Sequence, residues 1–177
     1  VDALVISGPF QPFTAAEQEA VLAFLEKGGR LAVMLHIGPP AADLLHRLGV
    51  SHANGVMRER QDVLNEQPLD FRVSRLEPHP LFAGIQSFAL FGGWPLVNDS
   101  EQVKLIAFTG PQAWVDLNRN KELDADDAVQ SFAVAAAGSV GKGEFVVFGD
   151  DAIFQNRYLE EYNGALGRNL VRWLGGK

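Results

Sequence analysis

The stretch that decides the fold is residues 3–35, ALVISGPFQPFTAAEQEAVLAFLEKGGRLAVML. Ala3 to Ser7 form a continuously apolar, β-branched run, which is typical of a buried strand in a parallel sheet. Thr14-Ala-Ala-Glu17 is a capping box that starts a helix, and Gly28-Gly29 ends it. Leu31 to Leu35 predict the next buried strand. Two such strands joined by a helix predict a right-handed crossover in a parallel sheet.

The middle of the chain, residues 51–115, has a different pattern. Proline and glycine interrupt it often, and the apolar runs between them are short. Strands are expected at Phe71–Leu76, Phe88–Phe91 and Val103–Phe108. This pattern predicts a mixed β excursion, with antiparallel additions to the main sheet.

The last third returns to the α/β pattern. Phe132 to Ala137 fit either a helix or a buried strand. Gly141-Lys-Gly143 predicts a hairpin-like turn, and Glu144 to Phe148 predict another apolar strand. Asn163 is expected to cap a terminal helix. Its apolar face consists of Leu166, Leu170, Trp173 and Leu174.

Composition limits the classes of function. The length of 177 residues indicates a single domain over residues 1–177, of the α/β class that the pattern predicts, and the apolar content of 47% is enough for a core. The net charge of −7 argues against binding to nucleic acid. No apolar run is long enough for insertion of this segment into a membrane. The absence of cysteine excludes disulfides, zinc-thiolate sites and cysteine nucleophiles. Because Val1 leads directly into an apolar run, we expect the segment to be part of a longer protein.

The stretch Asp116 to Asp127, DLNRNKELDADD, has the spacing of an EF-hand-type calcium loop. Oxygen-bearing side chains stand at loop positions 1, 3, 5, 9 and 12. Calcium prefers such hard oxygen ligands, and position 7 contributes a backbone carbonyl. The expected ligands of a structural Ca²⁺ are therefore Asp116, Asn118, Asn120, Glu122 through its main chain, Asp124 and Asp127.

Two residues depart from this pattern. Lys121 stands at position 6, where the EF-hand has glycine, and must adopt a left-handed conformation if the loop keeps its geometry. Asp127 replaces the usual glutamate at position 12, as in the calcium loops of dockerin modules, which these twelve residues resemble. The alternative is a solvated turn, since asparagine and aspartate favour turns for their own reasons.

A second set of polar residues follows predicted strands. Asp150 and Asp151 come directly after the strand at 144–148, and His36 follows the strand at 31–35. Ligand sites of open α/β sheets lie at these carboxyl ends. The carboxylates could bind a metal or act as acid and base, or one of them could cap the following short helix. Trp94 fits either contact with a sugar or partner, or a packed loop anchor.

Several segments resemble one family of domains. They are FLEKGGRLAVML at 24–35, HPLFAGI at 79–85, GKGEFVVFGDDAIFQNRYL at 141–159 and NGALGRNLVRWL at 163–174. They are similar to the DUF4350 and gliding-motility-type group of the class I glutamine amidotransferase-like superfamily. That superfamily also includes the N-terminal domain of an intraflagellar transport protein.

The resemblance implies a flavodoxin-like three-layer sandwich with a mainly parallel sheet. It further implies that a first strand and helix precede Val1, and that the domain is extracytoplasmic in a protein that is membrane-anchored. The enzyme relatives use a cysteine nucleophile. This sequence has none, so their catalytic residues have no counterparts here.

These observations favour a non-catalytic domain that binds or scaffolds a protein or carbohydrate partner, with Ca²⁺ stabilising one loop. The alternative is a hydrolase that uses Asp150 and Asp151, with His36, at the carboxyl edge of the sheet.

Overall fold

Three parallel strands form one side of the main sheet. The computed structural model describes residues 2–118 and 120–176. In it β1 (Ala3–Ser7) pairs with β2 (Arg30–Met34), which also pairs with β14 (Gly143–Phe148). The helix α1 (Ala15–Glu26) connects β1 to β2, as the sequence predicts. The three strands end together, since both Ser7 and Phe148 lie beside Met34.

The other side of the sheet is antiparallel, which corrects the expectation of a mainly parallel sheet. The hairpin between β13 (Ala133–Val140) and β14 is responsible, because a short turn can join only antiparallel strands. Gly141 occupies this turn with a φ of +57°. The remaining members are β10 (Lys104–Phe108), β7 (Arg75–Leu76), β9 (Leu96–Asn98) and β3 (Val50–His52).

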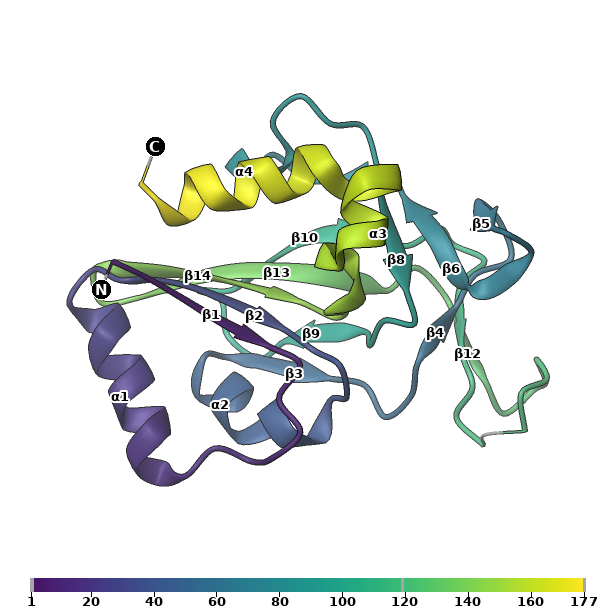
Figure 1. Ribbon diagram of the computed structural model, residues 1–177. Coiled ribbons are helices and arrows are strands. Elements are labelled where there is room, and N and C mark those ends of the chain that lie inside the picture. Colours follow the sequence, from purple (N-terminus) through teal and green to yellow (C-terminus); the bar gives the residue numbers. More distant parts are fainter. Residues whose placement is uncertain (1, 119, 177) are drawn as a thin grey trace.

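Helices cover the main sheet on both faces and make three layers (Figure 1). On one face lie α1 and α2 (Ala42–Arg47), which follows a 3-10 turn at Pro39–Ala41. On the other face lies α4 (Gly164–Leu174). Each face has its own apolar core, one containing Leu25 and Leu44 and the other containing Leu166 and Trp173.

The expected β excursion forms two small antiparallel sheets at one end of the molecule (Figure 1). One contains β5 (Val63–Leu64), β6 (Gln67–Val73) and β8 (Phe88–Phe91), which is followed along the chain by β9. The other contains β4 (Met57–Arg58), β11 (Trp114–Val115) and β12 (Ala128–Val129). A 3-10 turn at Pro80–Phe82 lies between β7 and β8.

Local signals at the helix ends are mostly confirmed. The Thr14 hydroxyl accepts from the Glu17 N–H at 3.3 Å, and the Glu17 carboxylate accepts from the Thr14 N–H at 2.8 Å. Gly28 has a φ of +99°, as a left-handed helix end requires. Asn163 does not cap α4 with its side chain, which corrects that expectation. The side chain is buried and bonds to the main chain of Ala89 and Ile153 instead.

The segment between β14 and α4 consists of short helical turns. They are a 3-10 turn at Ala152–Phe154, α3 (Asn156–Tyr158) and a π-helical turn at Leu159–Asn163. In the described part of the chain, no helix combines the length and apolarity that crossing a bilayer requires.

The strand β1 is parallel, as predicted, but it is not buried. It lies at the edge of the sheet, and Val5 is 49% exposed. The pattern of residues 3–7 is that of an interior strand, while their position in the described structure is that of an edge.

Candidate functional site

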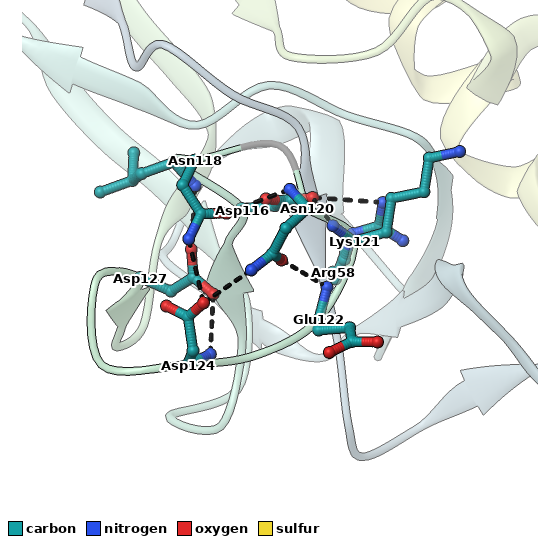
Figure 2. Close-up of polar contacts among 9 residues, drawn as sticks. Arg58, Asp116, Asn118, Asn120, Lys121, Glu122, Asp124 and Asp127 are labelled. Atoms are coloured by element: carbon teal, nitrogen blue, oxygen red, sulfur yellow. Dashed lines mark hydrogen bonds and ion pairs between the residues drawn. The ribbon is translucent and has the colours of Figure 1, made fainter.

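The Asp116–Asp127 loop connects β11 to β12, so its two ends are held beside each other by that strand pair (Figure 2). The pairs Trp114–Val129 and Val115–Ala128 set this register. The loop begins directly after β11 along the chain. The small sheet therefore fixes where the loop starts and where it returns.

Side chains at the early odd positions of the loop accept hydrogen bonds from its own backbone. The Asp116 carboxylate accepts from the Lys121 N–H at 2.9 Å. The Asn118 and Asn120 amide oxygens accept from the N–H two residues further on, at 3.0 and 2.7 Å. The bonds accepted by Asn118 and Asn120 are Asx turns, in which the side chain stabilises a tight turn of its own backbone.

The later carboxylates close the loop (Figure 2). Asp127 accepts from the backbone N–H of Leu117 and of Asp124, both at 3.0 Å. Asp124 accepts from the Asn118 and Asn120 amides at 3.0 and 2.6 Å. The pKa of Asp124 is held below its usual value, mainly by the backbone N–H of Asp126 and further by these two amides. The loop thus favours the ionised carboxylate.

Lys121 adopts the left-handed conformation that an EF-type loop demands at position 6, with a φ of 68°. This conformation costs a residue with a side chain about 1–2 kcal/mol. The hydrogen bond from its N–H to Asp116 offsets part of this cost. Of the two alternatives that the sequence left open for Lys121, the structure takes the left-handed one.

Asp116 is buried, with only 8% of its surface exposed. Its Oδ1 atom is buried and has no hydrogen-bond partner among the described residues. The guanidinium of Arg58 lies 3.8 Å from its other oxygen and stacks over the Trp114 ring. Arg58 Nε is likewise buried and unpartnered in the described structure. Arg58 thus neutralises part of the charge that a cation would meet.

The donor set fits Ca²⁺ in chemistry, because each ligand is an oxygen. Asn118 and Asn120 each keep a lone pair on the amide oxygen beyond the one used by the backbone. In the arrangement described, however, no three carboxylate or histidine side chains converge as a metal site within residues 2–118 and 120–176. The Asp124 carboxylate accepts hydrogen bonds from the Asn118 and Asn120 amides. Calcium binding therefore requires these three side chains to change rotamer, so that their oxygens face the ion.

The carboxyl ends of the parallel strands carry the second candidate cluster. His36 follows β2 and Asp151 follows β14, and His36 Nδ1 lies 3.1 Å from Asp151 Oδ1. Gly8, which follows β1, approaches the same carboxylate so closely that a Cβ there would lie 2.4 Å from Asp151 Oδ2. The contact of His36 with Asp151, which the hydrolase alternative requires, is therefore present, and it depends on glycine at position 8.

Asp150 does not join this pair. Only 3% of its surface is exposed, and its carboxylate accepts from the Phe91 N–H at 2.7 Å and the Ala152 N–H at 2.8 Å. Burial raises its pKa to about 7, against the opposite effect of the two N–H donors. Asp150 links the strand β8 to the turn at Ala152–Phe154, because its carboxylate accepts hydrogen bonds from both. The Asp150 side chain therefore has a structural role.

Trp94 serves as a loop anchor. Its indole N–H donates to the His36 carbonyl at 3.3 Å, and its ring lies nearly perpendicular to the His52 ring with centroids 5.5 Å apart. The loop that carries Trp94 is thereby held against the end of β2.

Sequence reasoning missed Arg58 and Asn169. Arg58 reaches Asp116 because β4 pairs with β11, which puts Arg58 opposite Trp114. No local signal indicates this pairing, since β4 has only two residues. Asn169 is buried in α4 and donates to the carbonyls of Leu81 and Ala83. A polar residue within the apolar stripe of a predicted helix is the signal that could have identified it.

The sequence matches the model of a protein family described as a domain of unknown function, DUF4350, over residues 2–171. The chain belongs to the DUF4350 family. Comparison with curated proteins gives no match. Solved structures of similar fold confirm the α/β fold that the resemblance implied.

The mmIFT52 N-terminal domain is similar to this DUF4350 domain with a TM-score of 0.76 and 21% identity, over 98% of this chain and 77% of that one. A ThuA-like protein from Bacteroides uniformis gives 0.56 and 17%, over 98% and 69%. A cytoplasmic protein from Salmonella typhimurium gives 0.58 and 14%, over 98% and 71%. At these identities the likeness concerns the fold alone.

Proposed function

We propose that this DUF4350 domain is a non-catalytic binding or scaffolding module whose Asp116–Asp127 loop takes up a structural Ca²⁺. One observation carries the calcium proposal. Among the described residues, the buried Oδ1 of Asp116 has no hydrogen-bond partner, and it lies in a loop whose backbone already has the left-handed residue at position 6. A buried acceptor without a partner is costly, and a cation would remove that cost.

The ligands in this proposal are side-chain oxygens and one carbonyl. Asp116, Asn118, Asn120, Asp124 and Asp127 contribute side chains, and Glu122 contributes its main chain. In Figure 2 the Glu122 side chain takes part in none of the hydrogen bonds drawn, which is consistent with a main-chain role. Arg58 disfavours calcium binding, because its guanidinium lies 3.8 Å from an Asp116 carboxylate oxygen and offsets part of that negative charge.

The same proposal concerns location and partner. We infer an extracytoplasmic domain that binds a protein or carbohydrate partner. The positive charges of Lys121 and Arg58 lower the expected affinity of the loop for calcium. We therefore expect a Kd of about 10⁻⁴–10⁻³ M, as in extracellular calcium-binding modules. A structural ion there would hold the β11–β12 end of the molecule in one conformation.

Calcium titration of chelator-treated protein tests the site. Calcium that binds only the folded state raises the thermal midpoint by mass action. We expect a rise at millimolar Ca²⁺ in the wild type and none in Asp116→Ala. The matched control is Asp126→Asn, which removes a charge at a loop position that supplies no ligand. An unchanged midpoint in the wild type, or an equal rise in Asp116→Ala, rejects the site.

The non-catalytic part of the proposal is supported by the use of Asp150. Its carboxylate is buried and bonded to two backbone N–H groups, so only Asp151 of the predicted pair is presented to solvent. The absence of cysteine leaves the amidotransferase nucleophile without a counterpart.

A hydrolase remains the second candidate, because His36 and Asp151 are in hydrogen-bond contact. An aspartate that orients a histidine is a known arrangement for general-base activation of water. We would assay ester, amide and glycoside model substrates with the wild type, His36→Gln and the control His46→Gln. Hydrolysis that His36→Gln abolishes and His46→Gln retains supports this candidate. Absence of hydrolysis by the wild type across the panel rejects it.

A further inference from the structure

A pocket of about 380 Å³ lies beside the first half of the Asp116–Asp127 loop. Residues 54–56 and Arg58 line it from the segment around β4, and Trp94 lines it from the segment before β9. Asp116 and Lys121 line it from the loop. Pockets for small molecules measure about 300–1,000 Å³ and combine apolar walls with a few polar groups. This pocket therefore has the size and the mixed lining of a small-molecule site.

Arg58 brings hydrogen-bond donors to the pocket that the described residues do not use. Its side chain is only 20% exposed, and it stacks over the Trp114 ring at 5.3 Å from the ring centroid. Among the described residues its Nε has no hydrogen-bond partner. The contact of its terminal nitrogen with Asp116 Oδ2, at 3.8 Å, is too long for a hydrogen bond. A guanidinium binds a planar carboxylate through two parallel hydrogen bonds, so a ligand carboxylate would supply the missing acceptors.

The charges of the lining favour an anion with a single negative charge. Arg58 and Lys121 contribute two positive charges, and Asp116 contributes one negative charge (Figure 2). In the described part of the chain the Lys121 ammonium forms no ion pair. The pocket thus has a local excess of one positive charge, although the whole chain carries a net charge of −7. Such an excess matches a carboxylate better than a dianionic phosphate, which Asp116 repels more strongly.

The other lining residues fit a polar ring. Trp94 donates its indole N–H to the His36 carbonyl at 3.3 Å, so its ring and the Val56 side chain remain for apolar contacts in the pocket. Asn54 is exposed and has an amide that both donates and accepts hydrogen bonds. A sugar ring combines an apolar face of C–H groups with hydroxyls that donate and accept. A hexuronate adds the carboxylate that Arg58 requires.

We propose that this pocket binds the hexuronate unit of an acidic carbohydrate. Its carboxylate bonds to Arg58 with Lys121 as the second cation, its ring packs against Trp94 and Val56, and a hydroxyl bonds to Asn54. This inference rests on the partner-binding part of the function proposed above and names the ligand class. It requires neither calcium in the loop nor hydrolysis.

Titration of isotope-labelled protein with glucuronate, followed by NMR, tests the pocket. A chelator is present, so the result does not depend on calcium. The reporters are the indole N–H of Trp94 and the amide N–H of Gly55, because both residues line the pocket. A ligand of this size is expected to bind with a Kd of about 1 mM. Glucose, which lacks the carboxylate, and acetate, which lacks the ring, should each bind at least about tenfold more weakly.

Two substitutions test the charged contacts one at a time. Arg58→Gln removes the guanidinium and should raise the Kd for glucuronate at least about tenfold. Lys121→Asn removes the exposed second cation and should raise this Kd about two- to fivefold. The matched control is Lys142→Asn, because Lys142 is also exposed but lies in the turn between β13 and β14, outside the pocket. Its Kd for glucuronate should equal that of the wild type.

The proposal is overturned if the reporters show no saturable shift in folded wild-type protein up to about 20 mM glucuronate. Equal affinity for acetate or for glucose overturns it as well, and so does an unchanged Kd in Arg58→Gln. Where Arg58→Gln does not fold, an unchanged Kd in Lys121→Asn has the same meaning. A thermal midpoint that rises with calcium in a protein that does not bind glucuronate rejects this pocket and retains the loop site, so the two failures are distinguishable.

Discussion

The carboxylate of Asp116 accepts a hydrogen bond of 2.9 Å from the backbone N–H of Lys121, five residues later. This bond joins positions 1 and 6 of the loop and holds Lys121 at a φ of 68°. This bond stabilises the loop conformation through the protein's own hydrogen bonding, and Lys121 is the residue with the strained backbone.

Replacement of Lys121 by asparagine should relieve this strain. Asparagine tolerates the left-handed region better than lysine, so Lys121→Asn is expected to stabilise the protein by about 0.5–1 kcal/mol. The affinity for calcium should rise as well, because the substitution removes the positive charge of the Lys121 ammonium group from the loop. Urea unfolding measures the first effect, with Lys142→Asn as control at a turn residue of negative φ. Equal effects of the two changes would contradict the strain account.

Removal of the Asn163 side chain should be among the most destabilising substitutions in the chain. Its amide makes three hydrogen bonds of 2.8–3.0 Å to the main chain of Ala89 and Ile153, and only 1% of the residue is exposed. Asn163→Ala would leave these buried groups unsatisfied, at about 3–5 kcal/mol. The exposed Asn156→Ala should stay within about 0.5 kcal/mol. Denaturant titration of both variants decides whether Asn163 has this role.

The stability of the protein should depend on pH through Asp150. Burial raises the pKa of Asp150 to about 7 in the folded state, whereas an unfolded aspartate titrates near 4. Between these values the folded state keeps a proton that the unfolded state has released. Rising pH through this window therefore reduces the free energy of unfolding, by about 1–4 kcal/mol in total.

Asp150→Asn should remove the part of the pH dependence of stability that Asp150 causes, since asparagine does not titrate. The readout is the slope of unfolding free energy against pH between about 4 and 7, compared with the wild type. The slope is preferred to absolute stability, because asparagine also alters the hydrogen bonds to Phe91 and Ala152. An identical slope in both proteins would show that Asp150 is ionised throughout.

The capping box at the start of α1 offers a test of a local interaction. Thr14→Ala removes the oxygen that accepts from the Glu17 N–H at 3.3 Å. The expected loss is about 1 kcal/mol, and Thr14→Ser should retain most of the stability. Thermal unfolding of the three proteins measures the difference. A similar loss in both variants would point to the methyl group and not to the cap.

Local patterns predicted much of the fold. The strand Ala3–Ser7, the cap at Thr14 and the stop at Gly28 depend on neighbouring residues, and each is present. Strand direction was predicted less well. The mixed sheet arises from the hairpin at Gly141, and a short apolar run does not show whether its neighbour will be parallel.

The candidate sites follow the same division. The spacing of Asp116 to Asp127 and the left-handed Lys121 were accessible from the order of residues, because a twelve-residue loop is a local structure. The Arg58 guanidinium near Asp116 was not, because the pairing of β4 with β11 joins residues that are far apart in the chain. The calcium itself stays a prediction.

By itself the sequence determined the capping box of α1, the turn glycines, the spacing of the Asp116–Asp127 loop and the lack of a cysteine nucleophile, since these depend on residues a few positions apart or on composition. Only the tertiary structure decided that His36 meets Asp151, that Asp150 is buried, and that β1 is an uncovered edge beside α4. These contacts follow from strand order, which is set by the packing of distant apolar faces and not by any short pattern of residues.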